Sequence, residues 1–343
     1  MKIGVLTSGG DCPGLNAVIR AITRKGLDLN YEVVGILNGW KGLFLQSYMP
    51  LNTKTVAGIV NRGGTILGTS RFSPFEEEKG ELTLQNRINN AGFDALITIG
   101  GEGSMHIAQL AHNLGINVIG VPKTIDNDIS GTDYTFGFDT AVQIATDAID
   151  RLHTTAESHH RIMVLEVMGR HAGWIALYSG MAGGADVIVI PEHKITVNEI
   201  IEVLKSRYAK GKQFSIIVVA EGAEFLLDEF KVHEEDKKID EFGRARLGGI
   251  SHYLANEIEK RSGFETRTTI LGHVQRGGVP TAFDRMLGTR FGIYSVEMVE
   301  QKKFGRMCAM HGTKIADIPI SEAIGTLKTV DPDIYKAAQV FFK

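Results

Sequence analysis

Short apolar runs alternate with segments of helical periodicity along most of this chain, and this alternation limits the folds that it can adopt. Runs rich in Ile and Val are typical of strands, and they lie at residues 2–7, 32–37, 94–99, 116–121, 161–168, 186–190 and 214–220. Apolar residues at helical spacing fill intervals between them, at 15–29, 104–114, 139–155 and 197–208. Such alternation builds βαβ units. The sequence therefore predicts an α/β fold with doubly wound, mostly parallel sheets.

The chain is long enough for more than one lobe. Its 343 residues, of which 43% are hydrophobic, exceed a typical single domain and can bury a large core. We therefore expect two Rossmann-like lobes that share a cleft. The most charged stretch, 228–246, is predicted to be a solvated loop or extension on the second lobe.

Charge and cysteine content exclude several classes of protein. A net charge of -3 provides no field for nucleic acid or a membrane surface, and no apolar run approaches the length of about 20 residues that spans a bilayer. Polar and acidic residues arrive by Ser8 and Asp11, so we expect no signal peptide at the start and a cytoplasmic protein. Cys12 and Cys308 are too few for a disulfide framework and lie in no zinc-like cluster; we expect Cys12 to be buried filler.

A polar cluster directly follows the strand-like run 116–121, and it contains Lys123, Thr124, Asp126 and Asp128. Open α/β sheets keep their ligand crevices at the carboxyl ends of strands. Phosphoryl transfer uses one carboxylate to accept a hydroxyl proton, another to hold Mg²⁺, and a cation beside the moving phosphate. The cluster fits that chemistry. The alternative is an Asx-rich turn that caps the next helix.

Three glycine-rich corners add to this pattern. Residues 7–14 lie between a strand and a helix, where backbone N–H groups can face an anion, although the spacing matches neither a Walker loop nor a dinucleotide fingerprint. Residues 100–104 end another strand, and Glu102 there is available to a metal. Residues 63–71 end in Arg71, a planar fork suited to phosphate. The alternatives are tight turns that bind nothing and a solvated Arg71.

Five segments in succession resemble the signatures of the 6-phosphofructokinase family. They are Ser-Gly-Gly-Asp-Cys-Pro-Gly-Leu-Asn-Ala at 8–17, Gly-Gly-Glu-Gly-Ser at 100–104, Pro-Lys-Thr-Ile-Asp-Asn-Asp at 122–128, Met-Gly-Arg-His-Ala-Gly at 168–173 and Leu-Gly-His-Val-Gln-Arg-Gly-Gly at 271–278. The resemblance covers nearly the whole chain in the family's order. It implies Mg²⁺-assisted transfer of a phosphoryl group from ATP to the 1-hydroxyl of fructose 6-phosphate.

The resemblance also implies the division of labour between the lobes. A nucleotide-binding lobe would comprise residues 1–137 with about 275–325, and a sugar-phosphate lobe residues 138–274 with about 326–343, with the active site in the cleft between them. Asp126 would be the base, and Asp128 and Glu102 would hold Mg²⁺, although the family more often has Asp at the latter position. Further catalytic groups implied are Lys123, Thr124 and Arg170.

The ligand-binding residues follow from the same resemblance. The set for the nucleotide is Gly10, Arg71, Phe72, Gly101, Glu102, Gly103 and Ser104. The set for the sugar phosphate is Thr124, Asp126, Asp128, Arg161, Met168, Gly169, Arg170, Glu221, Arg267, His273 and Arg276. In the family, Arg161 and Arg267 reach the 6-phosphate from a neighbouring subunit. The resemblance therefore implies a homo-oligomer, a tetramer or a dimer, with shared active sites.

Two positions bear on the phosphoryl donor. In the family that the chain resembles, members that use ATP usually have Gly at the positions of both 103 and 123, whereas members that use pyrophosphate have Asp at the first and Lys at the second. This chain has Gly103 and Lys123. A bulky anion at position 103 would exclude the nucleotide, and this effect is stronger than that of an added cation at position 123. Because this chain has no anion at 103, we expect ATP, with pyrophosphate as the alternative. Trp40 is placed to stack on adenine, although an aromatic residue there is also ordinary core material.

Two further hypotheses concern regulation and other classes of protein. The chain resembles only in part the anion-binding effector pocket of allosteric bacterial members, because Thr53 and His153 stand where those members usually have arginines. We therefore expect weak or altered control by ADP and phosphoenolpyruvate. The basic residues of that pocket are Arg20, Arg24, Lys210 and Lys212, and a solvated basic face is the alternative. NAD kinases and diacylglycerol kinases share the glycine corner but lack the downstream arginine and histidine set. A non-enzymatic nucleotide sensor need not keep a base, a metal carboxylate and three phosphate arginines together.

Overall fold

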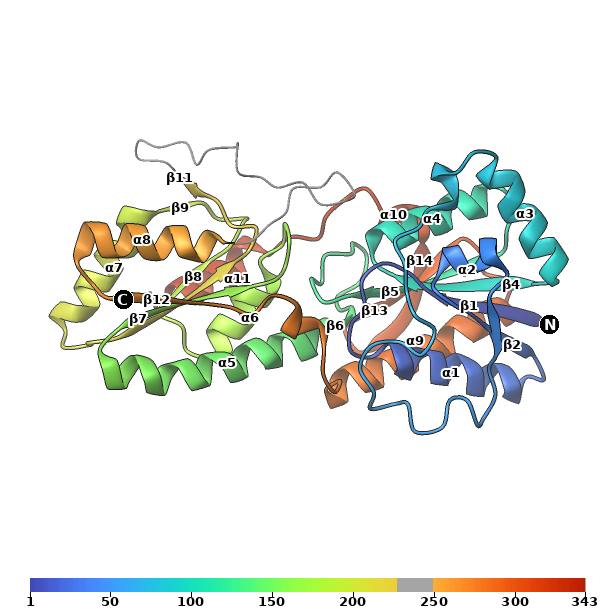
Figure 1. The fold of residues 1–343 in the computed structure, drawn as a ribbon, viewed down its shortest axis with the longest axis horizontal. Helices are drawn as coiled ribbons and strands as arrows, with labels where there is room; N and C mark the ends of the chain where they lie inside the picture. Colours follow the sequence, from blue (N-terminus) through green and yellow to red (C-terminus); the bar gives the residue numbers. More distant parts are fainter. Residues whose placement is uncertain (227–248, 343) are drawn as a thin grey trace. The chain divides into compact units, whose positions relative to one another are not determined.

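The computed structural model describes residues 1–226 and 249–342 (Figure 1). The charged stretch 228–246 lies outside these residues. The chain divides into two compact units, each built from two segments. The first unit is Met1–Thr140 with Arg276–Lys328, and the second is Ala141–Gln275 with Thr329–Lys343.

The first unit is built on an eight-stranded sheet. Its strands are β1 (Lys2–Thr7), β2 (Glu32–Ile36), β3 (Tyr48–Pro50), β4 (Ala95–Gly100), β5 (Val118–Thr124), β6 (Phe136–Gly137), β13 (Arg306–His311) and β14 (Lys314–Pro319). The order is β14-β13-β5-β4-β1-β2-β3, with β6 beside β5. The central strands run parallel, and β3 and β14 are antiparallel at the edges. Because both faces of β1 and β4 are covered, every residue of these strands except Lys2 is buried, and most are apolar.

Helices cover this sheet and bury their apolar stripes against it. They are α1 (Leu15–Asp28), α2 (Trp40–Leu45), α3 (Gly80–Ala91), α4 (Glu102–Asn113), α9 (Ala282–Glu300) and α10 (Ile320–Ala323), with a short 3₁₀ turn η1 (Pro74–Glu76). In Figure 1, α1 and α9 lie side by side, and their contacts are extensive. A Cβ at Gly292 of α9 would come within 2.6 Å of Ala21 on α1, so glycine permits this close approach.

The second unit has, among its described residues, a four-stranded parallel sheet in the order β12-β7-β10-β8. The strands are β7 (Ile162–Val167), β8 (Val187–Val189), β10 (Ser215–Ala220) and β12 (Thr266–Ile270), and a separate pair joins β9 (Ile195–Thr196) to β11 (Phe225–Leu226). The helices are α5 (Phe138–His159), α6 (Trp174–Ala182), α7 (Val197–Ala209), α8 (Ile250–Ser262) and α11 (Pro332–Gln339), with the 3₁₀ turn η3 (Gly272–Arg276).

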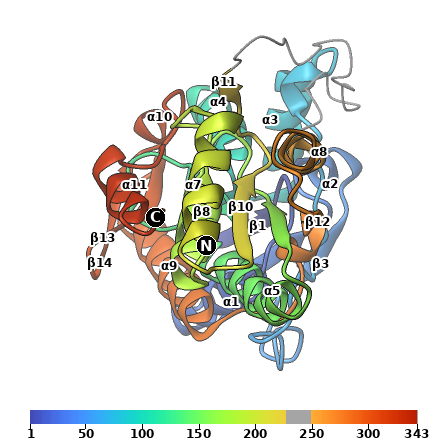
Figure 2. The same ribbon diagram turned by 90° about the vertical axis from the view of Figure 1, so that its left-hand side faces the viewer.

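Sequence and packing explain how α7 and α8 cover this sheet (Figure 2). Thr196 and Glu199 form a reciprocal capping box that starts α7. The buried residues of α7 and α8 then pack with the strands in one core, which includes Val164, Ile217 and Leu254. The sheet is therefore held by apolar burial on that face.

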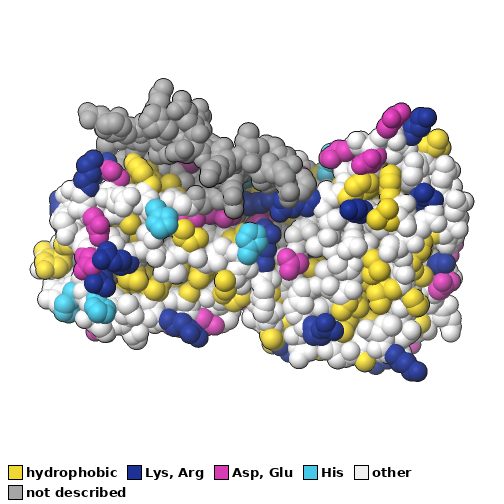
Figure 3. All heavy atoms as spheres, in the orientation of Figure 1, with side chains coloured by type: hydrophobic (Ala, Val, Ile, Leu, Met, Phe, Trp, Pro, Cys, Tyr) yellow, Lys and Arg dark blue, Asp and Glu magenta, His cyan; other side chains and the backbone are white. Residues whose placement is uncertain are grey.

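The predicted α/β class with mostly parallel sheets is confirmed. No helix within residues 1–226 and 249–342 is both long and apolar enough to cross a bilayer. Acidic and basic side chains are interspersed on the face drawn in Figure 3, in keeping with the small net charge.

Candidate active site

The three polar corners of the first unit meet at one edge of its sheet. Strands β1, β4 and β5 are parallel neighbours, with Thr7 opposite Ile99 and Gly100 opposite Pro122. Their carboxyl ends therefore lie together, and the Ser8 N–H continues the ladder by donating to the Ile99 carbonyl at 2.9 Å. The segments that follow these strands are the ones that the sequence predicted to carry a site.

Glycine allows these corners to approach one another. Gly9 has a φ of 82°, and a Cβ there would lie 3.4 Å from Ser104 Oγ and 3.8 Å from Lys123 Nζ. A Cβ at Gly100 would lie only 2.3 Å from Ser104 Oγ. Side chains of α4 and β5 thus converge on the backbone that follows β1, and Ser104 itself is buried.

Two cations lie against this backbone. Lys123 is only 5% exposed, and its Nζ donates a hydrogen bond to the Gly10 carbonyl. The Arg276 guanidinium lies on the same glycine, since its Nη1 is 3.1 Å from the position of a Cβ there. Burial lowers the pKa of Lys123, and Arg276 lowers it further, whereas Asp126 and Asp11 act in the opposite direction. A bound phosphate would favour the charged ammonium.

The loop after β5 holds Asp126 in a buried position. Asp126 is 6% exposed, and its backbone N–H donates to Thr124 Oγ1 at 3.0 Å. Asn127, with a φ of 52°, closes the loop because its Oδ1 accepts from Thr135 N at 3.0 Å. This bond spans eight residues, so Asn127 ties the two ends of the loop together and does not form the local Asx-turn of the alternative. Capping of the following helix is a role of another residue, since Thr140 N in the first turn of α5 donates to Asp284 Oδ2 at 2.8 Å.

Lys328 is a cation near Asp128 that the sequence analysis missed. Its backbone N–H donates to the Asp128 carbonyl at 3.0 Å, and its Nζ donates to the Asp133 carbonyl at 2.5 Å. Burial lowers the pKa of Lys328 to about 8, against the attraction of the Asp133 and Asp128 carboxylates. No motif surrounds Lys328 in the sequence, and it lies 200 positions after Asp128.

The other residues expected to bind a nucleotide have mixed surroundings. Glu102 is exposed at the start of α4, and a Cβ at the neighbouring Gly103 would meet no atom within 4 Å. Arg71 is exposed, whereas Phe72 is half-buried and packs edge-on against Phe44, with 5.0 Å between ring centroids.

Two expectations about single side chains are settled by burial. The adenine-stacking interpretation of Trp40 is wrong, because the side chain is 0% exposed and belongs to the core with Ile36 and Leu43. Cys12 is buried, as predicted, and so is Cys308; burial raises the pKa of both thiols.

A second set of predicted residues meets at the carboxyl edge of the second unit's sheet. Arg170 follows β7 and has a φ of 51°, and its backbone N–H donates to Glu221 Oε1 at 3.2 Å. Glu221 follows β10, and its own N–H donates to the Val167 carbonyl at 2.8 Å. Leu271 follows β12 and donates to the Glu166 carbonyl, which places η3 and its exposed His273 beside them. Met168 and Gly169, both buried, complete this edge.

Arg161 and Arg267 lie at the opposite end of the same sheet. Arg161 precedes β7, and Arg267 is the second residue of β12. Both guanidinium groups bond to Glu265, at 2.8 Å from Arg161 and 2.5 Å from Arg267. At 3.3 Å per residue, the length of β7 separates Arg161 from Met168 by about 20 Å. The second unit therefore does not bring these two arginines to His273.

The residues expected at an effector pocket are distributed over both units. Arg20 and Arg24 lie on α1 in the first unit, whereas Lys210 and Lys212 follow α7 in the second. His153 Nε2 lies 2.8 Å from the Gly183 carbonyl oxygen.

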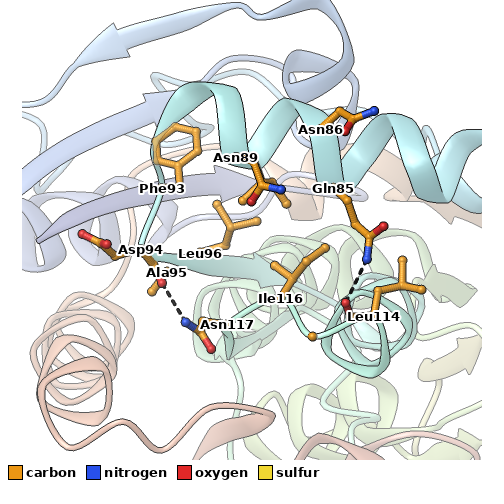
Figure 4. Close-up of a pocket in the computed structure, with 12 residues that line it drawn as sticks. Gln85, Asn86, Asn89, Phe93, Asp94, Ala95, Leu96, Leu114, Ile116 and Asn117 are labelled. Carbon is orange, nitrogen blue, oxygen red and sulfur yellow. Dashed lines mark hydrogen bonds between the residues drawn. The ribbon is translucent and has the colours of Figure 1, made fainter.

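A pocket of about 390 Å³ lies at the other end of β4 and β5, away from the polar corners (Figure 4). Side chains of α3 and of the segments before these strands line it, and Figure 4 shows Gln85 bonded to the Leu114 carbonyl and Asn117 bonded to the Asp94 carbonyl. None of the predicted site residues lines it.

Comparisons with known proteins show the family to which the chain belongs. The family model described as phosphofructokinase matches residues 2–299. The pyrophosphate–fructose 6-phosphate 1-phosphotransferase of Streptomyces coelicolor is 54% identical over 344 residues, covering 100% of both chains, and ATP-dependent 6-phosphofructokinase 3 of the same organism is 50% identical over 340 residues, covering 99% of both. The phosphofructokinase structure of Saccharomyces cerevisiae superposes with a TM-score of 0.82 at 31% identity, over 99% of this chain and 46% of that longer one. The chain belongs to the phosphofructokinase family.

Proposed function

We propose that this chain transfers a phosphoryl group to the 1-hydroxyl of fructose 6-phosphate, forms fructose 1,6-bisphosphate, and takes the phosphoryl group from pyrophosphate in preference to ATP. One observation carries the proposal: Lys123 and Arg276 both lie against Gly10, and the buried Asp126 is close enough to act on the charge of Lys123. Cations beside glycine backbone fit phosphate oxygens, and a carboxylate beside them fits a proton acceptor.

Within this proposal, the protein supplies positions and charges. Asp126 accepts the proton of the 1-hydroxyl as that oxygen attacks the phosphorus, while the bridging P–O bond of pyrophosphate breaks and the other phosphate leaves. Lys123 and Arg71 offset negative charge on the donor and on the group in transit. We assign Arg276 to the same task because it lies against Gly10, although the family resemblance implied that it holds the sugar phosphate. Thr124 and Arg170 complete the surroundings of that group, while Gly10, Gly101 and Ser104 bind donor oxygens. Phosphoryl transfer depends mainly on such positioning and electrostatic stabilisation.

The available carboxylates fit a magnesium ion that arrives with the donor. Mg²⁺ usually keeps several waters and binds one or two carboxylates together with substrate phosphates. Nowhere in the described ranges do three or more His, Cys, Asp or Glu side chains gather as a metal site. Asp128, half-buried, and Glu102, exposed, provide hard oxygen ligands of the required kind. When bound, Mg²⁺ would offset the charge of the donor phosphates.

The second unit supplies the groups proposed for the sugar phosphate. Met168, Gly169, Arg170, Glu221 and His273 share one edge of its sheet. Arg161 and Arg267 lie at the far end of that sheet, and we assign them to the 6-phosphate held by a neighbouring copy of the chain. That assignment requires a homo-oligomer with shared sites, because the two arginines lie too far from His273 to act with it within one chain. Forked guanidinium groups are the side chains best suited to a dianionic phosphate.

The preference for pyrophosphate depends on two residues, Lys123 and Trp40, to which the sequence-based expectation of ATP gave different roles. Pyrophosphate has no adenosine to contribute binding energy, so its affinity depends on cations. The corner at Gly10 has two of them, whereas the burial of Trp40 removes the aromatic side chain assigned to adenine. Relatives of similar identity are named for each donor, at 52% to 54% for pyrophosphate and 49% to 51% for ATP.

ATP is the second candidate, and Gly103 is the observation that favours it. No atom lies within 4 Å of a Cβ at this position, and no carboxylate there repels the α-phosphate of a nucleotide. ATP, the donor expected from the sequence, is therefore the alternative within this proposal.

A coupled spectrophotometric assay separates the two donors. Formation of fructose 1,6-bisphosphate is followed through aldolase and an NADH-linked dehydrogenase, with Mg-pyrophosphate or Mg-ATP at matched concentrations. We expect kcat/KM to be at least about tenfold higher with pyrophosphate, because the cations at Gly10 act on the phosphates alone. Turnover with ATP alone would reverse the order of the candidates, and turnover with neither donor would contradict the proposed function.

A further inference from the structure

Gln275 is a buried amide that takes no part in the chemistry proposed above. It lies in η3, two residues after His273, and is 0% exposed. Both ends of its side chain bond to backbone: Oε1 accepts from Met168 N at 2.8 Å, and Nε2 donates to the Ala141 carbonyl at 3.4 Å. One side chain thus joins the end of β7, the N-terminal part of α5 and η3.

The Met168 N–H lies where the strand ladder of β7 ends. Strand β12 pairs with β7 as far as Ile270 opposite Glu166, so the next N–H on this side needs another acceptor. Gln275 provides it from a side chain. A buried N–H without an acceptor costs free energy comparable to a lost hydrogen bond, which makes this contact a requirement of the local backbone.

The backbone after Met168 is strained and is held from two sides. Gly169 has a φ of 143°, and Arg170 has a φ of 51°, which is uncommon for a residue other than glycine. Gln275 binds the N–H before this pair, and Glu221 binds the N–H of Arg170. Such conformations persist when the surroundings impose them.

We propose that Gln275 is a positioning residue for the sugar phosphate. Its amide fixes the backbone at Met168 and so sets the direction in which Arg170 presents its guanidinium. The same amide holds η3 against β7, and so keeps His273 at the edge where Arg170 lies. This inference rests on the proposed function, which assigns Arg170 and His273 to the sugar phosphate.

The test replaces Gln275 by Met, which keeps the length of the side chain and removes both hydrogen bonds. We expect KM for fructose 6-phosphate to rise about tenfold, the effect of one buried hydrogen bond, while KM for pyrophosphate changes less than about twofold. The donor KM should change less than the KM for the sugar phosphate, because Lys123 and the glycine corners that bind the donor follow or end strands of the first unit. Arg276, which ends η3 and lies against Gly10, is the donor group adjacent to Gln275 and accounts for the small change expected. The rise in melting temperature that fructose 6-phosphate gives to the parent protein should shrink in parallel, which is a readout independent of turnover.

Tyr335→Phe is the matched control within the same unit. It removes a buried hydrogen bond from Tyr335 Oη to the Ile188 carbonyl, 2.8 Å long, on a strand two places from β7. Its KM for fructose 6-phosphate should equal that of the parent. Gln275→Glu is a second variant: it keeps the acceptor for Met168 but sets a carboxylate against the Ala141 carbonyl, so KM for the sugar phosphate should rise with pH.

Equal shifts of both KM values in Gln275→Met, or a Gln275→Glu protein with the parent's KM at every pH, would overturn the inference. A parent protein that does not phosphorylate fructose 6-phosphate with either donor would contradict the proposed function, and this inference with it.

Discussion

Lys123 combines two opposed effects in one side chain. Its ammonium is buried, which is costly, and it lies where the proposed function needs a cation. Lys123→Met keeps the volume and removes the charge. We expect kcat/KM with pyrophosphate to fall about 100-fold, because a cation beside transferred phosphate is lost, while the melting temperature does not fall.

Steady-state assays and thermal melts of the purified variant check this prediction together. Lys205→Met is a suitable control, since that lysine is exposed, pairs with Glu202 on α7 and belongs to the second unit, whereas the donor corners belong to the first. The proposed role of Lys123 fails if its variant keeps the parent's kcat/KM, or if lost activity merely accompanies a lower melting temperature.

At the scale of elements, burial decides what the sequence could predict. Strands with both faces covered, such as β1 and β4, are mostly apolar and were found. Strand β12 was missed because its sequence is Thr-Arg-Thr-Thr-Ile and it forms an edge of its sheet, so no apolar run marks it. The strand pair β13–β14 was missed as well, although it pairs with the central sheet.

The same reasoning applies to the candidate site. Carboxyl ends of adjacent parallel strands must lie together, so the corners after β1, β4 and β5 could be predicted from their glycines and charges. Gln275 and Lys328 could not, because their partners are 107 and 200 positions away and neither contact leaves a local pattern. For Trp40 the sequence left adenine stacking and core packing open, because the packing of α2 on the sheet, which buries this side chain, is a tertiary effect.

The junction of α9 with α5 predicts a dependence of stability on pH. Asp284 on α9 is fully buried and accepts from Thr140 N and Oγ1, and burial raises its pKa to about 6. A carboxyl whose folded pKa is raised binds protons more readily when folded. Its ionisation therefore costs stability above about pH 6, and this cost disappears below the unfolded value of about 4.

The Asp284→Asn variant measures that cost. It should be more stable than the parent at about pH 8, by roughly 3 kcal/mol for two pKa units, and the difference should vanish near pH 4. Denaturant unfolding of both proteins across this range gives the comparison. A constant difference at all pH values would show that Asp284 does not titrate within it.

The chain is a phosphotransferase of the phosphofructokinase family. At the scale of the whole molecule, the question is how many copies of the chain contribute residues to one active site. Within one chain, Arg161 and Arg267 bond to Glu265 at the end of the sheet opposite to His273. If a neighbouring copy uses them, Asp126→Ser and Arg267→Ala damage the same site from different chains. Each variant alone should then lose most of its activity, the first in kcat and the second through KM for fructose 6-phosphate.

Co-expression of these two variants tests that arrangement directly. In a mixed oligomer, the intact Asp126 of one copy meets the intact Arg267 of the other, so activity should return to about a quarter of the parent's for random pairing in a dimer. The two variants purified separately and combined only in the assay, so that their chains do not exchange, fix the level expected without complementation. If the mixed oligomers form but stay as inactive as the single variants, each site is completed within its own chain, and the arginines at Glu265 are structural.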